Sequence, residues 1–290
     1  MEDKRNEKRS LAMLIASMAI WGSLGLFRRA IPLPSSVLAF VRGVAGSLFL
    51  ILFVKAKGGR VNAGMTRKQI AWFGTAGAIM AFNWILLFDA YNYTSVAVAT
   101  LCYYMMPVFV TLASALLFGE KLTARKLLCV AVCVAGMLLV TGVAEGDAPT
   151  GSEIRGIVMG LAAAVLYSTV VLMNKKMPGM DAYEKTIVQL IGAAVIMVPY
   201  ILVTEDVTAL SLDGRGALML FIVAAVHTGI AYALYFGCMD DLKAQTVAIF
   251  SYVDPIVAVL LSAFVLGEPL SALGVLGVVL VLGAAVVSEL

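Results

Sequence analysis

The chain has 290 residues, of which 62% are hydrophobic and 13% are charged, whereas soluble globular proteins average roughly 45–50% and 25%. The mean hydropathy of +0.98 excludes an ordinary soluble domain and indicates a membrane protein with several spans. The net charge of +3 is small, and the lysines and arginines are confined to a few loops, which argues against a nucleic-acid partner.

Ten apolar segments, each near the length of a membrane-spanning helix, follow one another along the chain. Open strands would leave backbone groups unpaired in lipid, so each segment is predicted to be a helix. The polar stretch 142–153 separates five spans from five, which predicts an all-α membrane protein with two five-helix units at 1–142 and 154–290. The predicted spans are 11–30, 35–54, 69–91, 95–118, 124–142, 154–175, 183–203, 216–237, 244–266 and 270–288.

The first 30 residues resemble a signal peptide, because the charged stretch MEDKRNEKR precedes an apolar run. This run is long and lacks a small-x-small cleavage site, so it is predicted to be an uncleaved first helix. The loops on the side of the N-terminus hold 16 lysines and arginines, and those on the other side hold four. The positive-inside rule therefore predicts a multi-pass protein of the inner (plasma) membrane with both termini cytoplasmic and loop 143–153 on the far side.

The stretch 103–122, YYMMPVFVTLASALLFGEKL, returns near the end of the chain as YVDPIVAVLLSAFVLGEPL at 252–270. In each copy a proline, Pro107 or Pro255, precedes a Gly-Glu pair by 12 positions, and the copies lie 148 residues apart. A duplication at half the chain length is the simplest origin. With five helices in each half, the second copy is upside down relative to the first, so the sequence predicts two inverted repeats.

At these residues the chain resembles the ten-helix EamA-type branch of the drug/metabolite transporter superfamily. The resemblance covers the whole chain as two EamA repeats and rests on Trp21-Gly22, on Arg42 and on the two Pro-x11-Gly-Glu patterns. It implies an exporter or importer of small metabolites with a central cavity between the halves, and peripheral helices five and ten. One departure is Gln189, which stands about where Arg42 would recur, so that charge is not duplicated.

Three ionisable residues lie inside predicted spans, where a charge costs roughly 2.5–3.5 kcal/mol on insertion scales. Asp254 is in the middle of the ninth span, His227 is central in the eighth, and Arg42 is well inside the second. We predict that these residues face a wet cavity as ligands for a substrate or a proton. The alternative is an internal ion pair that only fixes helix packing. For His227, a hydrogen-bonded core histidine is the slightly favoured interpretation.

The two repeated prolines are predicted to mark the transport site. Pro107 and Pro255 each remove a backbone donor, which frees the carbonyls of Tyr103 and Ser251. Kinked helices at matching places in two halves are typical of transport sites, although a kink can also merely shape the packing. Nearby aromatic rings are predicted to cover an apolar or cationic ligand. They are Trp21, Trp84, Tyr103, Tyr104, Tyr232 and Tyr252.

Other patterns are predicted to be structural. Glu120 and Glu268 follow the fourth and ninth spans and are predicted to cap the helix that comes next. Small residues recur in spans five and ten, which suits close helix packing and leaves a homodimer open. The four cysteines lie inside apolar runs without C-x-x-C spacing, so they are predicted to be small buried residues. No metal site and no cofactor is expected.

The leading functional hypothesis is a secondary transporter that moves a small metabolite, such as an amino acid or an amine, by alternating access at a central cavity. Coupling to a proton or an ion is left open. The alternative class is an intramembrane enzyme with Asp254 and His227 as acid and base, but no H-E-x-x-H, G-x-S-x-G or paired-aspartate motif supports it. A channel is a third option, although one chain supplies no ring of repeated polar residues.

Overall fold

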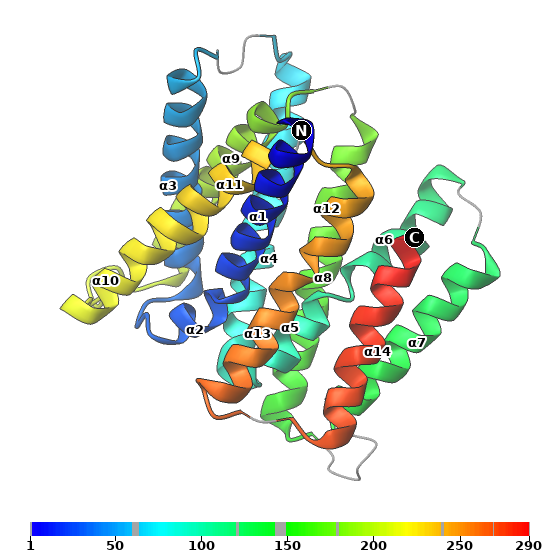
Figure 1. Cartoon of the computed structure of the whole chain (residues 1–290). Helices are drawn as coiled ribbons and strands as arrows, with labels where there is room; N and C mark the ends of the chain where they lie inside the picture. Colours follow the sequence, from blue (N-terminus) through cyan, green and yellow to red (C-terminus); the bar gives the residue numbers. More distant parts are fainter. Residues whose placement is uncertain are drawn as a thin grey trace.

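The computed structural model is a bundle of helices, without a strand among the residues it describes (Figure 1). These residues are 2–59, 64–119, 122–142, 149–177, 180–238, 241–268 and 270–289. The helices of the first half of the chain are α1 (Glu2–Gly22), α2 (Leu24–Arg29), α3 (Ser35–Ala56), α4 (Arg67–Tyr93), α5 (Val96–Tyr103), α6 (Met106–Phe118) and α7 (Ala124–Val140). Those of the second half are α8 (Gly151–Lys176), α9 (Ala182–Thr204), α10 (Gly214–Ile222), the π-helix η2 (Val223–Ile230), α11 (Ala231–Cys238), α12 (Ala244–Ser251), α13 (Val253–Phe264) and α14 (Ala272–Glu289).

Seven helical stretches among the described residues are long and apolar enough to cross a membrane. Two shorter apolar helices follow them, at Ile249–Phe264 and Ala272–Val287. Large hydrophobic side chains such as Leu116, Val203 and Phe264 are mostly exposed on the outside of the bundle. An apolar exterior of this kind belongs in lipid, so the chain is a multi-pass membrane protein. The seven stretches are Lys8–Arg29, Ser35–Ala56, Arg67–Tyr93, Val96–Phe118, Gly151–Lys176, Ala182–Thr204 and Gly214–Cys238.

Polar side chains fix where the helices begin. Thr66 and Thr150 each form a capping box, with Gln69 and Glu153 respectively. Asp213 accepts a hydrogen bond of 2.7 Å from the backbone N–H of Gly216 at the start of α10. Caps of this type satisfy N–H groups that the first helical turn leaves unpaired. The polar breaks of the sequence therefore coincide with helix starts.

Four of the predicted spans are interrupted in the structure. The stretch 95–118 breaks after Tyr103, and α6 restarts with Pro107 in its first turn. The stretch 244–266 breaks at Tyr252, immediately before α13. Ser23 separates α1 from α2, and the π-helix η2 interrupts the stretch 216–237. The breaks near Pro107 and Pro255 follow from the backbone N–H donor that each proline lacks. The interruptions at Ser23 and η2 contain no proline, so the sequence did not predict them.

The first helices of the two halves run in opposite directions. At the end of α2, Arg29 donates hydrogen bonds of 3.0 Å to the carbonyls of Tyr91 and Thr94. At the start of α8, Ser152 donates to the carbonyl of Tyr93 over 3.4 Å. The end of α2 and the start of α8 thus lie at the same end of the bundle, as Figure 1 also shows. We call this end, where α2 ends and α8 begins, the α2 end.

The helices on both sides of the break in each half's proline-containing span pack on the first helix of the other half. Helix α1 contacts α12 and α13, and α8 contacts α5 and α6. Two residues make these approaches close. Gly22 lies so near the carbonyl oxygen of Asp254 that a Cβ would collide with it, and Ser168 donates a 3.1 Å hydrogen bond to the carbonyl of Met106. Each half thus packs its interrupted span against the first helix of the other half.

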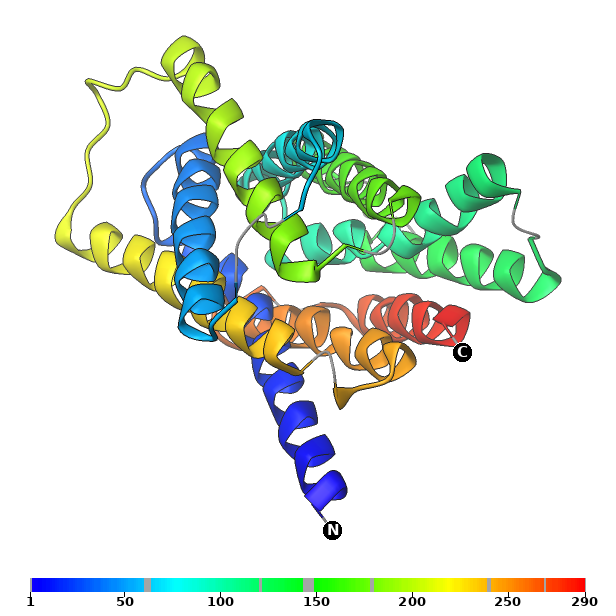
Figure 2. The ribbon, with the colours of Figure 1, turned by 90° about the horizontal axis from the view of Figure 1, so that it is seen from above.

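Helices α7 and α14 pack against each other at one side of the bundle (Figures 1 and 2). Gly136 and Gly277 form the closest point of this contact. A Cβ on Gly136 would lie 2.8 Å from the carbonyl oxygen of Gly277, so only a small residue fits there. The small residues of the last span of each half therefore serve a contact within the chain, and a homodimer built on them remains a prediction.

Two expectations fall partly or wholly outside the described residues. Glu120, predicted to cap the helix after the fourth span, lies outside them, and so do residues 143–148 of the predicted far-side loop. Glu268 lies within the described residues, and the prediction that it caps the next helix is wrong. Its carboxylate accepts a 3.0 Å hydrogen bond from the N–H of Val96, so it caps α5 rather than the next helix, α14. Ser271 takes the expected role at the start of α14.

Candidate functional site

An open cavity of about 590 Å³ lies among α1, α3, α4, α5, α6, α8, α9, α11 and the break before α13. No described residue of α7 or α14 lines it. Nearly all of the side chains predicted as site residues meet there, whereas His227 and Pro255 do not line it. The predicted residues that do are Trp21, Arg42, Trp84, Tyr103, Tyr104, Pro107, Tyr232, Tyr252 and Asp254.

The cavity is closed at one end and accessible at the other. Tyr91 and Thr100 line it toward the α2 end, and both are buried. Their hydroxyls lie 3.4 Å apart. Asn174 near the end of α8 and Thr186 near the start of α9 line it toward the opposite end, where both are partly exposed. The cavity therefore opens away from the α2 end.

Arg42 is the cation of this cavity. The residue is only 4% exposed, and its guanidinium carbon lies 4.4 Å from the Trp84 ring centroid and 5.5 Å from that of Phe88. Its Nε donates a 3.3 Å hydrogen bond to the Thr228 hydroxyl. Among the described residues no carboxylate lies within ion-pair distance of Arg42. A buried guanidinium without a counter-ion is costly, which makes this group a ready ligand for an anionic part of a bound molecule.

The π-helix η2 holds Arg42 in place. The Thr228 hydroxyl, which accepts the hydrogen bond from Arg42, also donates one of 3.1 Å to the carbonyl of Val223, five residues earlier. The Trp21 indole donates a 2.8 Å hydrogen bond to the carbonyl of His227, which ties α1 to the same segment. Short π segments inside α-helices are frequent at functional sites. The local widening of the helix thus positions both a polar partner for Arg42 and an anchor for Trp21.

His227 lies behind the cavity wall instead of lining it. The residue is 1% exposed, its Nε2 is 2.9 Å from the Ser23 hydroxyl, and its ring packs on Phe27. Its Nδ1 has no hydrogen-bond partner among the described residues. The core-histidine alternative therefore describes its surroundings better than the predicted role as a cavity ligand.

Asp254 is the carboxylate of the cavity and lies in the first turn of α13, directly after the break at Tyr252. The Tyr104 hydroxyl donates a 3.5 Å hydrogen bond to the neighbouring Ser251 carbonyl, which Pro255 leaves without its usual helical donor. Gly22 packs against the backbone of Asp254. No lysine or arginine among the described residues forms an ion pair with it. The cavity thus holds one guanidinium and one carboxyl group, and among the described residues no ion pair joins them.

Aromatic rings surround the space between the two charges. The Trp21 ring lies 5.5 Å from Tyr232 and 5.2 Å from Tyr235. On the other side, the Tyr103 ring lies 6.0 Å from Tyr104 and 5.6 Å from Tyr167. The negative faces of such rings attract ammonium groups and cover apolar surface. The wall between Arg42 and Asp254 therefore suits a small amphipathic molecule.

An ion pair lies beyond the closed end of the cavity. Arg29 of α2 pairs with Glu268, which follows α13. The Glu268 carboxylate also accepts a 2.6 Å hydrogen bond from Ser262. Arg29 also donates hydrogen bonds to the carbonyls of Tyr91 and Thr94. This pair links the α2 end of the first half to α13, between the cavity and the surface.

Several residues of the site carried no clear signal in the sequence. Thr228, Thr100 and Tyr91 are polar residues within apolar segments, and such residues are common in membrane helices without marking a site. Gln189 was noted only as the counterpart of Arg42, yet it lines the cavity and donates a 2.7 Å hydrogen bond to Asn174. The duplication could have identified Tyr167, because it lies 146 positions after Trp21, close to the 148 residues that separate the two copies.

Comparisons with known proteins agree with this architecture. The chain matches the EamA-like transporter family over residues 8–142 and 154–289. It is 27% identical to the uncharacterized transporter YxxF of Bacillus subtilis over 277 residues, which is 96% of this chain and 88% of that one. It is 23% identical to protein RarD of Salmonella typhi, covering 92% and 89% of the two chains.

A further relative and a solved structure extend the comparison. A probable amino-acid metabolite efflux pump of Escherichia coli is 26% identical over 213 residues, covering 68% of each chain. A crystal structure of a protein with 20% sequence identity superposes with a TM-score of 0.68 and covers 96% of this chain and 95% of its own. At that identity the superposition shows a shared fold.

Proposed function

Because this chain belongs to the EamA-like transporter family, we propose that it is a secondary transporter for a small zwitterionic metabolite, such as an amino acid. Membership of the family and relatives named as transporters make it a membrane transporter of small molecules and not an enzyme. The intramembrane enzyme considered for Asp254 and His227 is therefore set aside. The chemical class of the substrate is our inference from the cavity.

The observation that carries this proposal is the pair of unneutralised charges on one cavity. Arg42 and Asp254 both line it, and neither has an ion-pair partner among the described residues. A molecule with a carboxylate for Arg42 and an ammonium group for Asp254 would satisfy both, and a charge-assisted hydrogen bond is worth roughly 1.5–3 kcal/mol. The name of the Escherichia coli relative, an amino-acid metabolite efflux pump, supports the same class.

Counterflow in liposomes tests the substrate class. Purified protein is reconstituted into vesicles preloaded with one unlabelled compound, and entry of the same labelled compound is measured. We expect exchange of at least one zwitterionic amino acid and much weaker exchange of its decarboxylated and deaminated analogues. Exchange of a neutral sugar with none of any zwitterion would contradict the proposal.

We propose that transport proceeds by alternating access between two inverted five-helix repeats that together supply ten spans. The opposite directions of α1 and α8 support this arrangement, as do the reciprocal contacts of α1 with α13 and of α8 with α6. Inverted halves offer two equivalent packings, one open to each side. In the present packing, the Arg29–Glu268 pair keeps the α2 end closed.

We further propose that the α2 end faces the outside of the cell, so that the cavity opens to the cytoplasm. The lysine and arginine count of the loops supports cytoplasmic termini in the plasma membrane of a bacterial cell. Two single-cysteine variants test topology and closure together, because the four native cysteines are all buried. Ser152→Cys should react with an impermeant maleimide added to intact cells, whereas Thr100→Cys should be protected. Protection of Ser152→Cys until lysis would overturn the topology.

A variant that lacks the Arg29–Glu268 ion pair extends this labelling experiment. In the Glu268→Gln background, the closed end should open more often, so Thr100→Cys should be labelled from outside several times faster than before. Arg215→Gln, which removes a charge from the same predicted side of the membrane, serves as the matched control and should leave the rate unchanged. An unchanged rate in Glu268→Gln would mean that the pair does not hold the gate closed.

A further inference from the structure

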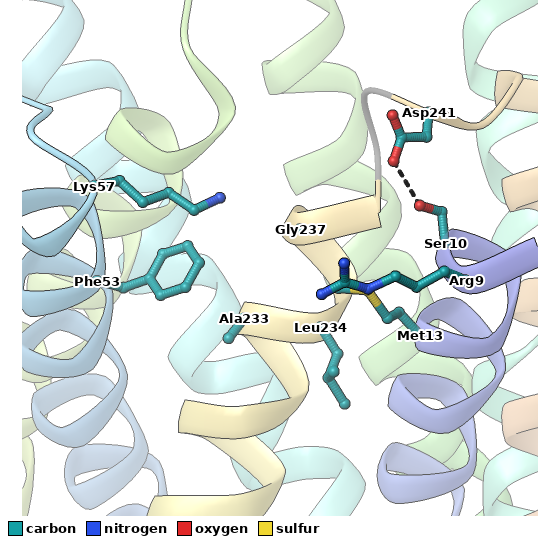
Figure 3. Close-up of a pocket in the computed structure, with 9 residues that line it drawn as sticks. All are labelled: Arg9, Ser10, Met13, Phe53, Lys57, Ala233, Leu234, Gly237 and Asp241. Atoms are coloured by element: carbon teal, nitrogen blue, oxygen red, sulfur yellow. Dashed lines mark hydrogen bonds between the residues drawn. The ribbon is translucent and has the colours of Figure 1, made fainter. Parts of the chain in front are cut away.

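A second pocket, of about 530 Å³, lies at the end of the bundle opposite the α2 end. It is framed by the N-terminal part of α1, the last turns of α3 and the outer face of α11 (Figure 3). Arg9 and Met13 line it from α1, Phe53 and Lys57 from the end of α3, and Leu234 from α11. No residue is shared between this pocket and the central cavity.

The two hollows lie on opposite faces of α11. Tyr232, Tyr235 and Phe236 line the central cavity, whereas Ala233, Leu234 and Gly237 line the second pocket. With 3.6 residues per helical turn, these two sets point away from each other. The second pocket is therefore not the mouth of the transport cavity but a site on the outer side of the helix that carries the aromatic wall.

Two cations reach into this pocket from opposite walls. Figure 3 shows the Arg9 guanidinium and the Lys57 ammonium group pointing toward each other across Leu234 and Ala233. Among the described residues, neither cation has a carboxylate within ion-pair distance. Asp241, at the rim, accepts a 2.6 Å hydrogen bond from Ser10 instead. The pocket therefore has room and unused positive charge for an anionic group.

The rest of the lining is apolar and sits at the boundary of the membrane. Arg9 stands at the start of the first candidate span, and Lys57 follows directly after the second, Ser35–Ala56. Below the charges, Met13, Phe53 and Leu234 form the walls, and the Lys57 ammonium group lies 4.7 Å from the Phe53 ring centroid. A phosphate between two cations above apolar walls is how basic pockets between membrane helices take up lipid headgroups.

We propose that this pocket is a binding site for an anionic phospholipid, with its phosphate between Arg9 and Lys57 and an acyl chain along Met13, Phe53 and Leu234. The apolar walls favour a lipid over a free phosphate, which would leave them uncovered. Because Arg9 belongs to α1 and Lys57 to the end of α3, the bound headgroup bridges two helices of the transport bundle. The lipid therefore stabilises their spacing on the side where the central cavity is open.

Native mass spectrometry of the purified full-length protein tests the site, by titration with phosphatidylglycerol and, separately, with phosphatidylcholine. The parent should bind phosphatidylglycerol more tightly than phosphatidylcholine. In the Arg9→Gln/Lys57→Gln double variant the apparent affinity for phosphatidylglycerol should fall, by roughly fivefold for each cation removed. The matched control Lys8→Gln/Lys55→Gln removes the same charge from the same two helices without touching the pocket, and it should bind as the parent does.

The remaining arms make the result decisive. Thermal unfolding in neutral detergent shows that both double variants are folded, and a stabilising effect of phosphatidylglycerol should be lost only in Arg9→Gln/Lys57→Gln. Inorganic phosphate at matched concentration should neither stabilise the parent nor displace the lipid. Equal loss of affinity in both double variants would mean that bulk positive charge and not this pocket attracts the lipid, and unchanged affinity would exclude the site.

Discussion

Replacing Asp254 by Asn is expected to weaken uptake of the zwitterionic substrate strongly while leaving the folded protein in the membrane. Asn has almost the same shape, so the contact with Gly22 at the backbone of residue 254 is preserved. The change removes the carboxylate that faces the cavity. Loss of one charge-assisted contact of about 1.5–3 kcal/mol reduces apparent affinity by roughly ten- to a hundred-and-fifty-fold. If the same carboxylate also binds the coupled proton, gradient-driven uptake disappears altogether.

The control variants separate these effects. Asp254→Glu keeps the charge and should retain part of the activity, whereas Asp213→Asn, at the cap of α10, should transport normally if it folds. Substrate affinity measured by thermal shift and uptake measured with and without an imposed gradient distinguish a binding role from a coupling role. Normal gradient-driven uptake by Asp254→Asn would show that the charge is dispensable, and the assignment of Asp254 to the site would fail.

The positions of the helices could be predicted from the sequence because the bilayer imposes a simple rule. A segment in lipid must pair its own backbone groups, so apolar length alone marks a helix. The breaks at Tyr103 and Tyr252 could also be predicted, since Pro107 and Pro255 each remove a donor. The break at Ser23 and the π-helix η2 could not. Both depend on contacts between distant parts of the chain, such as that of Trp21 with the carbonyl of His227.

The charges of the candidate site were visible in the sequence, but their partners were not. Arg42 and Asp254 stood out because an ionisable group inside a span is costly and needs a reason. Thr228 accepts the hydrogen bond from Arg42, but nothing in the sequence distinguishes it from other hydroxyl residues of membrane helices. Glu268 was predicted to cap a neighbouring helix, yet it pairs with Arg29 from the other half of the chain. Such pairings are set by the packing of the halves and leave no local pattern.

Replacing Arg42 by Gln is expected to give a protein that no longer recognises the substrate but is at least as stable as the parent without it. The guanidinium is 4% exposed and has no carboxylate partner among the described residues. Its burial therefore costs desolvation that stacking on Trp84 and one hydrogen bond to Thr228 recover only in part. Removing such a charge is often neutral or stabilising, in contrast to breaking a buried ion pair.

Because burial leaves the Arg42 guanidinium without a carboxylate partner, it should bind the carboxylate of the substrate strongly. Counterflow by Arg42→Gln should fall by roughly tenfold or more for the amino acid, and the decarboxylated analogue should be affected far less, because it has no group for Arg42 to bind. Arg42→Lys should recover little, since an ammonium group lacks the planar fork that can stack on Trp84 and bind a carboxylate with two hydrogen bonds. Thermal unfolding of both variants without substrate supplies the stability measurement. A clear loss of stability in Arg42→Gln, with equal loss of transport for both compounds, would identify Arg42 as a structural residue of the bundle instead of the carboxylate ligand.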